Sequence, residues 1–277
     1  MKSLLLKYPV FFRYTGAIIL FTLALIVSGF IDRPILKTYF PFTSVILLLL
    51  VTALLYKWDK KSLKSIGLNV TRKNLSFFPL GILIGAIAFM IAKYFRGLYT
   101  GELFELTTAV IDYKVLLYGF YTILPAVMIE ELLFRGYLFK KTVEVSNVVI
   151  ANIIFGVLFM LVHILDREII QHRAMVLFLM ITIPVGHLLF ATALLKSKTL
   201  YFPIGIHLGN NWATRHLITK SNNGESIFYI PENAPIDTWT DFIIVLIVFN
   251  AFFLFVTFVI WKWDKIIVRM KNYLAIF

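Results

Sequence analysis

The sequence predicts an all-α protein, a polytopic membrane helical bundle with about eight transmembrane helices. Apolar residues make up 60% of its 277 residues, compared with about 45–50% in soluble domains. Charged residues make up only 15%, and they lie in clusters between apolar stretches of helix-spanning length. Because a backbone in lipid must satisfy its own hydrogen bonds, stretches of this length favour helices over barrel strands.

The apolar stretches define the predicted elements in order. The first lacks a small-residue cleavage site after it, so we expect a retained helix rather than a signal peptide. The third contains Gly81 and Gly85, a GxxxG pair that predicts close helix packing. The seventh is the least apolar, which indicates either a helix hidden inside the bundle or a re-entrant segment. The eight stretches are residues 15–31, 39–56, 77–95, 116–139, 147–165, 174–195, 199–216 and 240–261.

The charge distribution predicts orientation and excludes some partners. The net charge is +12, but Lys and Arg gather at the ends of spans rather than on one basic face, so no nucleic-acid partner is expected. With both termini in the cytoplasm, 17 Lys and Arg lie on the cytoplasmic side and nine on the other, with Arg135 inside the fourth span. This asymmetry follows the positive-inside rule. Short loops favour a bacterial inner membrane, with membrane lipids as partners.

No repeat or additional domain is found, so residues 1–277 are predicted to form a single integral membrane domain. The largest loop, about residues 217–239, is expected to be an ordinary exposed connection. The chain contains no cysteine, which excludes disulfides and thiolate chemistry.

Ionisable residues inside spans carry the functional information, because each costs roughly 2.5–3.5 kcal/mol at a helix centre. In the fourth span, Glu131 and Arg135 have the spacing and order of a helical ion pair, whereas Glu130 points about 100° away. A carboxylate left without a cation in an apolar site can accept a proton near neutral pH. The alternative is a charge cluster that anchors the end of the span.

Two later spans add imidazoles and a carboxamide. Phe159 and His163 share one helix face, as do His207 and Asn211. Alone, each pair has a structural explanation, as an interfacial group or an interhelical hydrogen bond. Together with the carboxylates they supply a base, a partner that holds water and oxyanion donors, the parts needed for hydrolysis. His187, in the sixth span, is expected to be structural.

At these residues the sequence resembles the CPBP family of intramembrane proteases, also called the type II CAAX prenyl protease or bacterial Abi family. The resemblance covers about residues 116–216 and implies a CAAX-protease-like bundle whose motif-bearing catalytic core helices lie in that range. Eukaryotic members remove the last three residues after a prenylated cysteine, while some bacterial members have no known substrate. The family's motifs occur here in order, as Glu130-Glu131-x-x-x-Arg135, Phe159-x-x-x-His163 and His207-x-x-x-Asn211.

The resemblance implies an endopeptidase that cleaves a lipid-attached or hydrophobic peptide with a water activated by Glu130. His163 would assist the base, and His207 and Asn211 would stabilise the oxyanion. Glu131 and Arg135 would support the geometry as an ion pair. The sequence requires no cofactor, although Glu130, His163 and His207 are also a conceivable zinc site. The HExxH, GxGD and GxSG motifs of other intramembrane proteases do not occur.

Two other functions remain open from the sequence. The main alternative is a non-enzymatic immunity or signalling protein that uses the same polar residues as a scaffold. A transporter is disfavoured, because the two halves show no repeat of broken helices. One observation opposes convergence of the clusters. Counted along a helix from Lys140, which marks the cytoplasmic interface, Glu130 lies about 15 Å inside the membrane. His163 is only three residues from Asp166 on the non-cytoplasmic side, so the two residues are expected at different depths.

Overall fold

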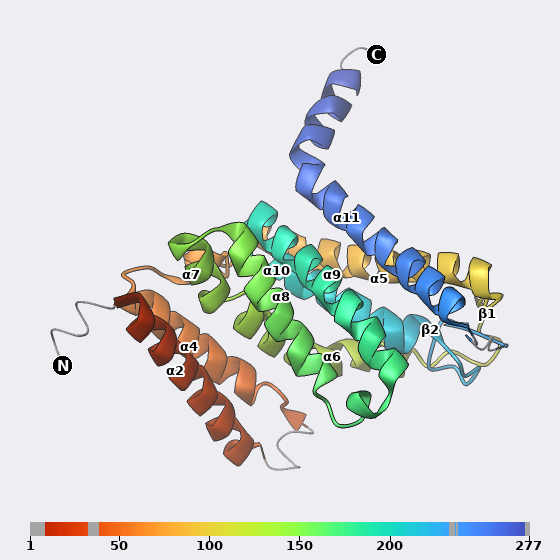
Figure 1. The fold of residues 1–277 in the computed structure, drawn as a ribbon, viewed down its shortest axis with the longest axis horizontal. Helices are drawn as coiled ribbons and strands as arrows, with labels where there is room; N and C mark the ends of the chain where they lie inside the picture. Colours follow the sequence, from red (N-terminus) through yellow and green to blue (C-terminus); the bar gives the residue numbers. More distant parts are fainter. Residues whose placement is uncertain (1–8, 33–38, 233–235, 237, 275–277) are drawn as a thin grey trace.

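The computed structural model describes residues 9–32, 39–232, 236 and 238–274, and helices dominate this part of the chain (Figure 1). Lys2, Lys7, Arg33 and Lys37, which entered the comparison of Lys and Arg on the two sides, lie outside the described residues. The α-helices are α2 (Pro9–Ile31), α4 (Thr43–Trp58), α5 (Arg72–Thr100), α6 (Tyr113–Phe134), α7 (Tyr137–Val145), α8 (Val148–Ile164), α9 (Arg173–Ser197), α10 (Tyr201–Trp212) and α11 (Trp239–Leu274).

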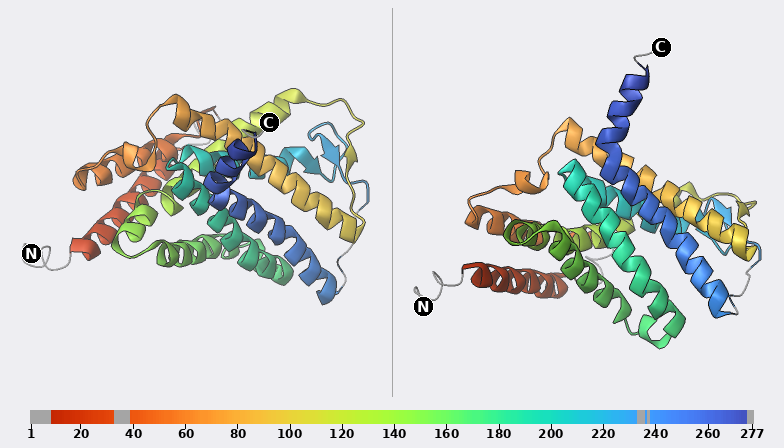
Figure 2. Two further views of the ribbon diagram at one scale, coloured as in Figure 1. Left: turned by 90° about the horizontal axis from the view of Figure 1, so that it is seen from above. Right: turned by 45° about the horizontal axis from the view of Figure 1, so that its top comes forward.

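Each of the eight predicted apolar stretches contains a helix, which confirms the all-α polytopic membrane fold. Five helical segments are long and apolar enough to cross a membrane, and α4 and α8 are shorter apolar helices of 16 and 17 residues. The views in Figures 1 and 2 show α2 beside α4 at one side of the molecule and α5, α9 and α11 at the other. Two 3₁₀ turns, Leu63–Ile66 and Ile169–Gln171, lie between helices.

The predicted span at 116–139 is wrong at its C-terminal end, because the helix ends at Phe134. Arg135 and Gly136 leave the helical conformation, and the chain restarts as the separate helix α7. A Cβ on Gly136 would lie 2.1 Å from the carbonyl oxygen of Leu132, so the break requires glycine. The apolar pattern continues across the break, and for that reason the sequence showed one span.

Helix α10 packs most extensively against α5, and this contact depends on glycines from both helices. A Cβ on Gly81 or Gly85 would lie 2.7 or 2.0 Å from the carbonyl oxygens of Phe202 and Ile206. Conversely, a Cβ on Gly205 or Gly209 would lie 2.3 or 2.1 Å from carbonyl oxygens of α5. The predicted packing role of the GxxxG pair is confirmed, and its partner is a second GxxxG pair on α10.

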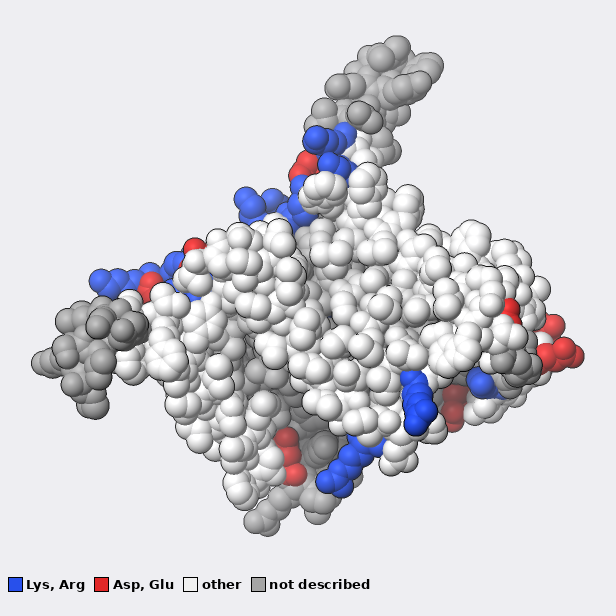
Figure 3. Space-filling view, viewed as in Figure 1, with Lys and Arg blue, Asp and Glu red and all other residues white. Residues whose placement is uncertain are grey.

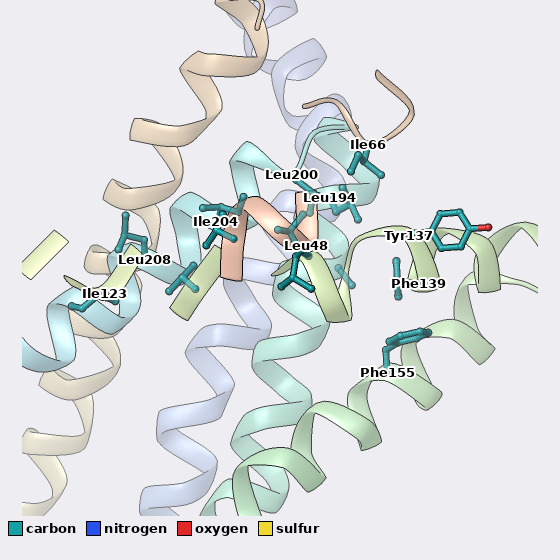
Figure 4. Close-up of a cluster of buried hydrophobic side chains, with 14 of the residues drawn as sticks. Leu48, Ile66, Ile123, Tyr137, Phe139, Phe155, Leu194, Leu200, Ile204 and Leu208 are labelled. Atoms are coloured by element: carbon teal, nitrogen blue, oxygen red, sulfur yellow. The ribbon is translucent and has the colours of Figure 1, made fainter. Parts of the chain in front are cut away.

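The hydrophobic core surrounds α10. Among the residues of α10, nine of twelve are buried, which identifies the seventh stretch as a helix enclosed by the bundle. Figure 4 shows how side chains from α4, α6, α8, α9 and α10 meet in the main buried cluster, including Leu48, Ile123, Phe155, Leu194 and Ile204. This enclosure fixes the polar side chains that α10 carries.

Charged side chains tie helix ends together at one end of the bundle. Asp59, just after α4, pairs with Arg13 of α2 at 3.0 Å and with Lys141 of α7 at 2.8 Å. Burial alone would raise the pKa of Asp59, but hydrogen bonds from Lys141 and Tyr137 outweigh burial and hold that pKa below its ordinary value. Figure 3 shows a broad uncharged surface between this Lys- and Arg-rich rim and the mixed charges at the opposite edge.

The segment after α10 is more ordered than the exposed connection that the sequence predicted. It begins with a π-helical turn, Ala213–Leu217. Two-residue strands then pair in a small sheet of order β1-β3-β2, and Ile218, Ser226 and Ile230 are buried beneath it. Apolar residues in this segment therefore cover the end of the bundle. The strands are β1 (Glu105–Leu106), β2 (Ile218–Thr219) and β3 (Phe228–Tyr229).

Candidate active site

The structure brings the three predicted polar clusters to one hollow. Helix α6 supplies Glu130, α8 supplies His163, and α10 supplies His207 and Asn211, and all four line a cavity of about 780 Å³. Glu131 lies beside it, fully buried. The roles of these residues are still predictions, but their convergence is an observation.

Glu130 is the carboxylate that faces both imidazoles. Its Oε2 lies 3.6 Å from Nε2 of His207 and 4.0 Å from Nε2 of His163. The side chain is 30% exposed, whereas that of Glu131 is 0% exposed. Within the described part of the chain, the buried Oε2 of Glu130 has no hydrogen-bond partner. The acceptor capacity of this oxygen is therefore not used by the protein itself.

In His163 and His207, the ring nitrogen that faces away from Glu130 is Nδ1, and its hydrogen-bond partner shows that it carries a proton. Nδ1 of His163 lies 2.8 Å from the carbonyl oxygen of Phe159, and Nδ1 of His207 lies 2.9 Å from Oε1 of Glu131. A carbonyl and a carboxylate only accept hydrogen bonds, so both Nδ1 atoms donate. In the neutral rings, Nε2 is then the unprotonated nitrogen, and both Nε2 atoms face Glu130.

A buried ion pair and two aromatic rings hold His207 in place. Arg135 Nη1 donates to Oε1 of Glu131 at 3.1 Å, and both side chains are fully buried. The guanidinium lies over the ring of Phe159 at 4.0 Å and near that of Phe190 at 5.0 Å. Phe190 also stacks on the His207 ring, with centroids 4.6 Å apart. The stacking on Phe190 was not predicted, because an aromatic residue in an apolar span carries no distinguishing signal.

The predicted difference in depth between Glu130 and His163 is wrong, since their side chains lie 4.0 Å apart. The depth of Glu130 was counted along a helix from Lys140. That helix does not exist, because α6 ends at Phe134 and α7 is a separate element. Lys140 is therefore not a valid origin for the count.

His187 lies next to the site but outside the hollow. It is 1% exposed and packs against the rings of Phe139 and Phe159, 5.8 and 6.4 Å away between centroids. Neither ring nitrogen has a hydrogen-bond partner among the residues that the structure covers. These contacts agree with the structural role expected from the sequence.

The zinc alternative concerns Glu130, His163 and His207. Their unprotonated Nε2 atoms and the carboxylate are chemically suitable ligands. In the described ranges, however, no group of three or more His, Cys, Asp or Glu side chains has the arrangement of a metal site. The residues as they stand do not form the ligand set, so no step below passes through a metal.

Four basic side chains at the end of the hollow away from Glu130 were not predicted from the sequence as site residues. Lys93 and Arg96 of α5, and Arg215 and Lys220 after α10, also line the hollow. From the sequence they were interpreted only as markers of membrane orientation. The signal that identifies Arg215 is its position four residues after Asn211, on the same helical side.

The fold and site define a polytopic membrane protein with hydrolase-type residues around an intramembrane hollow. Residues 112–213 match the family model of the type II CAAX prenyl endopeptidase Rce1-like proteins. The match runs from the N-cap of α6 to the residue after α10. The matched segment contains all three motifs, and the match agrees with the family that they indicated. Comparisons with curated proteins and with solved structures gave no match.

Proposed function

We propose that the protein is an intramembrane endopeptidase that hydrolyses a peptide bond in a lipid-attached or hydrophobic peptide. The observation that supports it best is the position of one partly exposed carboxylate, Glu130, whose Oε2 lies 4.0 Å and 3.6 Å from the Nε2 atoms of His163 and His207 in a hollow of about 780 Å³. The Rce1-like domain supports the same reaction class.

Glu130 acts as the general base. A water held by the carboxylate of Glu130 and Nε2 of His163 donates its protons to these two acceptors, and its oxygen attacks the substrate carbonyl carbon. Glu130 takes the proton as the carbon–oxygen bond forms. When the carbon–nitrogen bond breaks, Glu130 returns that proton to the leaving amine, so the enzyme ends in its starting state.

His207 and Asn211 stabilise the negative charge that develops on the carbonyl oxygen. The carboxamide of Asn211 donates directly. His207 enters the reaction as an imidazolium that keeps both protons throughout, with Nδ1 donating to Glu131 and Nε2 donating to the oxyanion. Glu131 and Arg135 do not touch the reacting atoms in this scheme, and they act as positioning residues for His207.

The substrate enters from the membrane in this proposal. The hollow is lined by apolar residues such as Phe178, Ile183, Phe249 and Phe253 as well as by the polar set. Such a lining accepts a hydrophobic or lipidated peptide, while membrane lipids surround the bundle. Nothing in the charge pattern favours a nucleic acid, and the reaction requires no cofactor.

We place both termini in the cytoplasm, in the inner membrane of a bacterium. Arg13, Lys61 and Lys141 lie at one end of the bundle, where they pair with Asp59 and Glu144. The positive-inside rule assigns this end to the cytoplasm. The end of the hollow that Ile218 and Thr219 of β2 line then lies toward the opposite side.

The non-enzymatic alternative rests on the buried network of Glu131, Arg135 and His207, which is sufficient as a scaffold. It predicts that biological function survives Glu130→Gln and fails when Glu131 or Arg135 is replaced. The endopeptidase proposal predicts loss of function in all three variants.

The test uses purified protein in proteoliposomes with fluorogenic peptides that carry a cysteine four residues from the C-terminus, with and without a farnesyl group. Glu130→Gln removes the base but keeps the shape of the side chain, and we expect a loss of about 10²–10⁴-fold in kcat. The matched control is Glu168→Gln, an exposed acid outside the hollow, which should cleave like the wild type. Equal cleavage by Glu130→Gln and wild type would overturn the assignment.

A further inference from the structure

We propose that basic side chains at the far end of the hollow bind the free C-terminal carboxylate of the peptide substrate. This inference rests on the proposed function and specifies which peptides it accepts. The residues are Lys93, Arg96, Arg215 and Lys220, and Glu130 is the one acidic residue among the lining side chains.

The far end of the hollow carries excess positive charge. Glu102 offsets part of it, because its Oε2 lies 2.7 Å from Nη2 of Arg96 and 3.5 Å from Nζ of Lys93. In the part of the chain that the structure describes, Arg215 and Lys220 form no ion pair. Both are exposed at residue level, although they line the hollow. A cleft with charges of one sign and apolar walls concentrates ligands of the opposite sign.

Arg215 and Lys93 lie at about the same distance from His207 along the bundle axis. Helices α5 and α10 run in parallel, because Gly81 contacts Phe202 and Gly85 contacts Ile206. Arg215 lies eight residues after His207, and Lys93 lies eight residues after Gly85. At 1.5 Å per residue, each cation is about 12 Å further along the bundle than His207.

This distance matches a short peptide. An extended chain spans about 3.3–3.6 Å per residue, so three residues cover about 10–11 Å. A peptide bond held at Glu130 therefore places the C-terminal carboxylate of a three-residue leaving segment near Arg215. Asn210 and Thr214 line the hollow between the two ends and offer hydrogen-bonding groups along the way.

Arg215 is the residue best placed for this contact. It lies in the π-helical turn Ala213–Leu217, a feature that is frequent at functional sites, and its guanidinium binds carboxylates in a bidentate manner. An anionic lipid headgroup is another source of negative charge. The peptide is favoured because the cations and Glu130 line one continuous hollow rather than separate surfaces.

The test compares one farnesylated fluorogenic peptide in two forms, with a free C-terminal carboxylate and with a C-terminal amide. We expect the wild type to cleave the acid about tenfold faster in kcat/KM than the amide. Arg215→Gln should reduce cleavage of the acid to the level of the amide. The control Arg72→Gln removes an exposed charge at the opposite end of α5 and should keep the wild-type preference.

Several outcomes separate this inference from the proposed function. Cleavage of acid and amide at equal rates by the wild type would overturn the carboxylate site and leave the endopeptidase intact. If the wild type cleaves neither form, binding of both peptides to Glu130→Gln is measured by tryptophan fluorescence. Tighter binding of the acid, lost on adding Arg215→Gln, supports the site without turnover, and equal binding overturns it. Rates that depend on phosphatidylglycerol in the vesicles but not on amidation indicate a lipid headgroup and also overturn it.

Discussion

Replacement of Glu131 by Gln should destabilise the protein, whereas the same replacement of the adjacent Glu130 should leave its stability nearly unchanged. Glu131 is fully buried and accepts hydrogen bonds from both Arg135 and His207. Removing one member of a buried pair costs about 3–5 kcal/mol, since the other charge stays uncompensated. Nε and Nη2 of Arg135 already lack partners among the described residues, so Glu131→Gln leaves the guanidinium poorly satisfied. We expect a loss near the lower limit, about 3 kcal/mol, because the amide oxygen still accepts.

Glu130 has a different environment. It is 30% exposed, and the nearer of the two imidazole nitrogens, Nε2 of His207, is 3.6 Å from its Oε2. Its replacement by Gln breaks no close hydrogen bond, and we expect a change in the free energy of unfolding within about 0.5 kcal/mol. The two variants therefore differ by about 2.5 kcal/mol or more in stability.

Thermal unfolding in detergent, followed by tryptophan fluorescence, measures this difference. At roughly 2–4 °C per kcal/mol for a chain of this size, Glu131→Gln should lower the Tm by about 6–12 °C. Glu130→Gln should leave the Tm nearly unchanged and abolish cleavage. Equal stability of Glu131→Gln and wild type, or equal destabilisation by both variants, would refute the division into positioning and catalytic carboxylates.

Three further predictions test the packing, the charge cluster and the metal question. Gly85→Ala places a Cβ 2.0 Å from a carbonyl oxygen of α10 and should cost about 1–3 kcal/mol of stability. Gly29→Ala, where no atom of the described residues lies within 4 Å of the added Cβ, should be tolerated, and equal Tm values for the two variants would contradict the helix contact. The depressed pKa of Asp59 contributes stability above the unfolded value of about 3.9, and this contribution is lost as pH falls through the folded pKa. The Tm of wild type should therefore fall more steeply below about pH 5 than that of Asp59→Asn, and parallel curves would contradict the shift. Cleavage should survive chelators; a loss restored by zinc would instead assign Glu130, His163 and His207 as metal ligands.

The sequence was sufficient to predict the helices and the meeting of the polar clusters, because ionisable groups in lipid are too costly to retain without partners. Glu130, His163 and His207 were recognised in this way. The break at Gly136 was not, since the apolar pattern of 116–139 continues through it. Periodicity reports which side chains are apolar and does not report where a backbone turns.

The remaining features depend on tertiary contacts that one stretch of sequence does not contain. Gly81 and Gly85 indicated close packing, but their partners Gly205 and Gly209 became evident only when α5 and α10 were seen side by side. Arg215 was interpreted from the sequence only as an orientation marker. Its position on the hollow that also contains Glu130 became evident only in the structure.

The central claim is that Glu130 activates a water molecule rather than attacking the substrate itself. A single turnover of a farnesylated peptide in H₂¹⁸O, with enzyme in excess and analysis by mass spectrometry, tests it directly. Direct attack by water predicts one ¹⁸O in the new carboxylate of the product and none in the protein. Label in the side chain of Glu130, with an unlabelled product, would show a covalent intermediate on Glu130 and contradict the account.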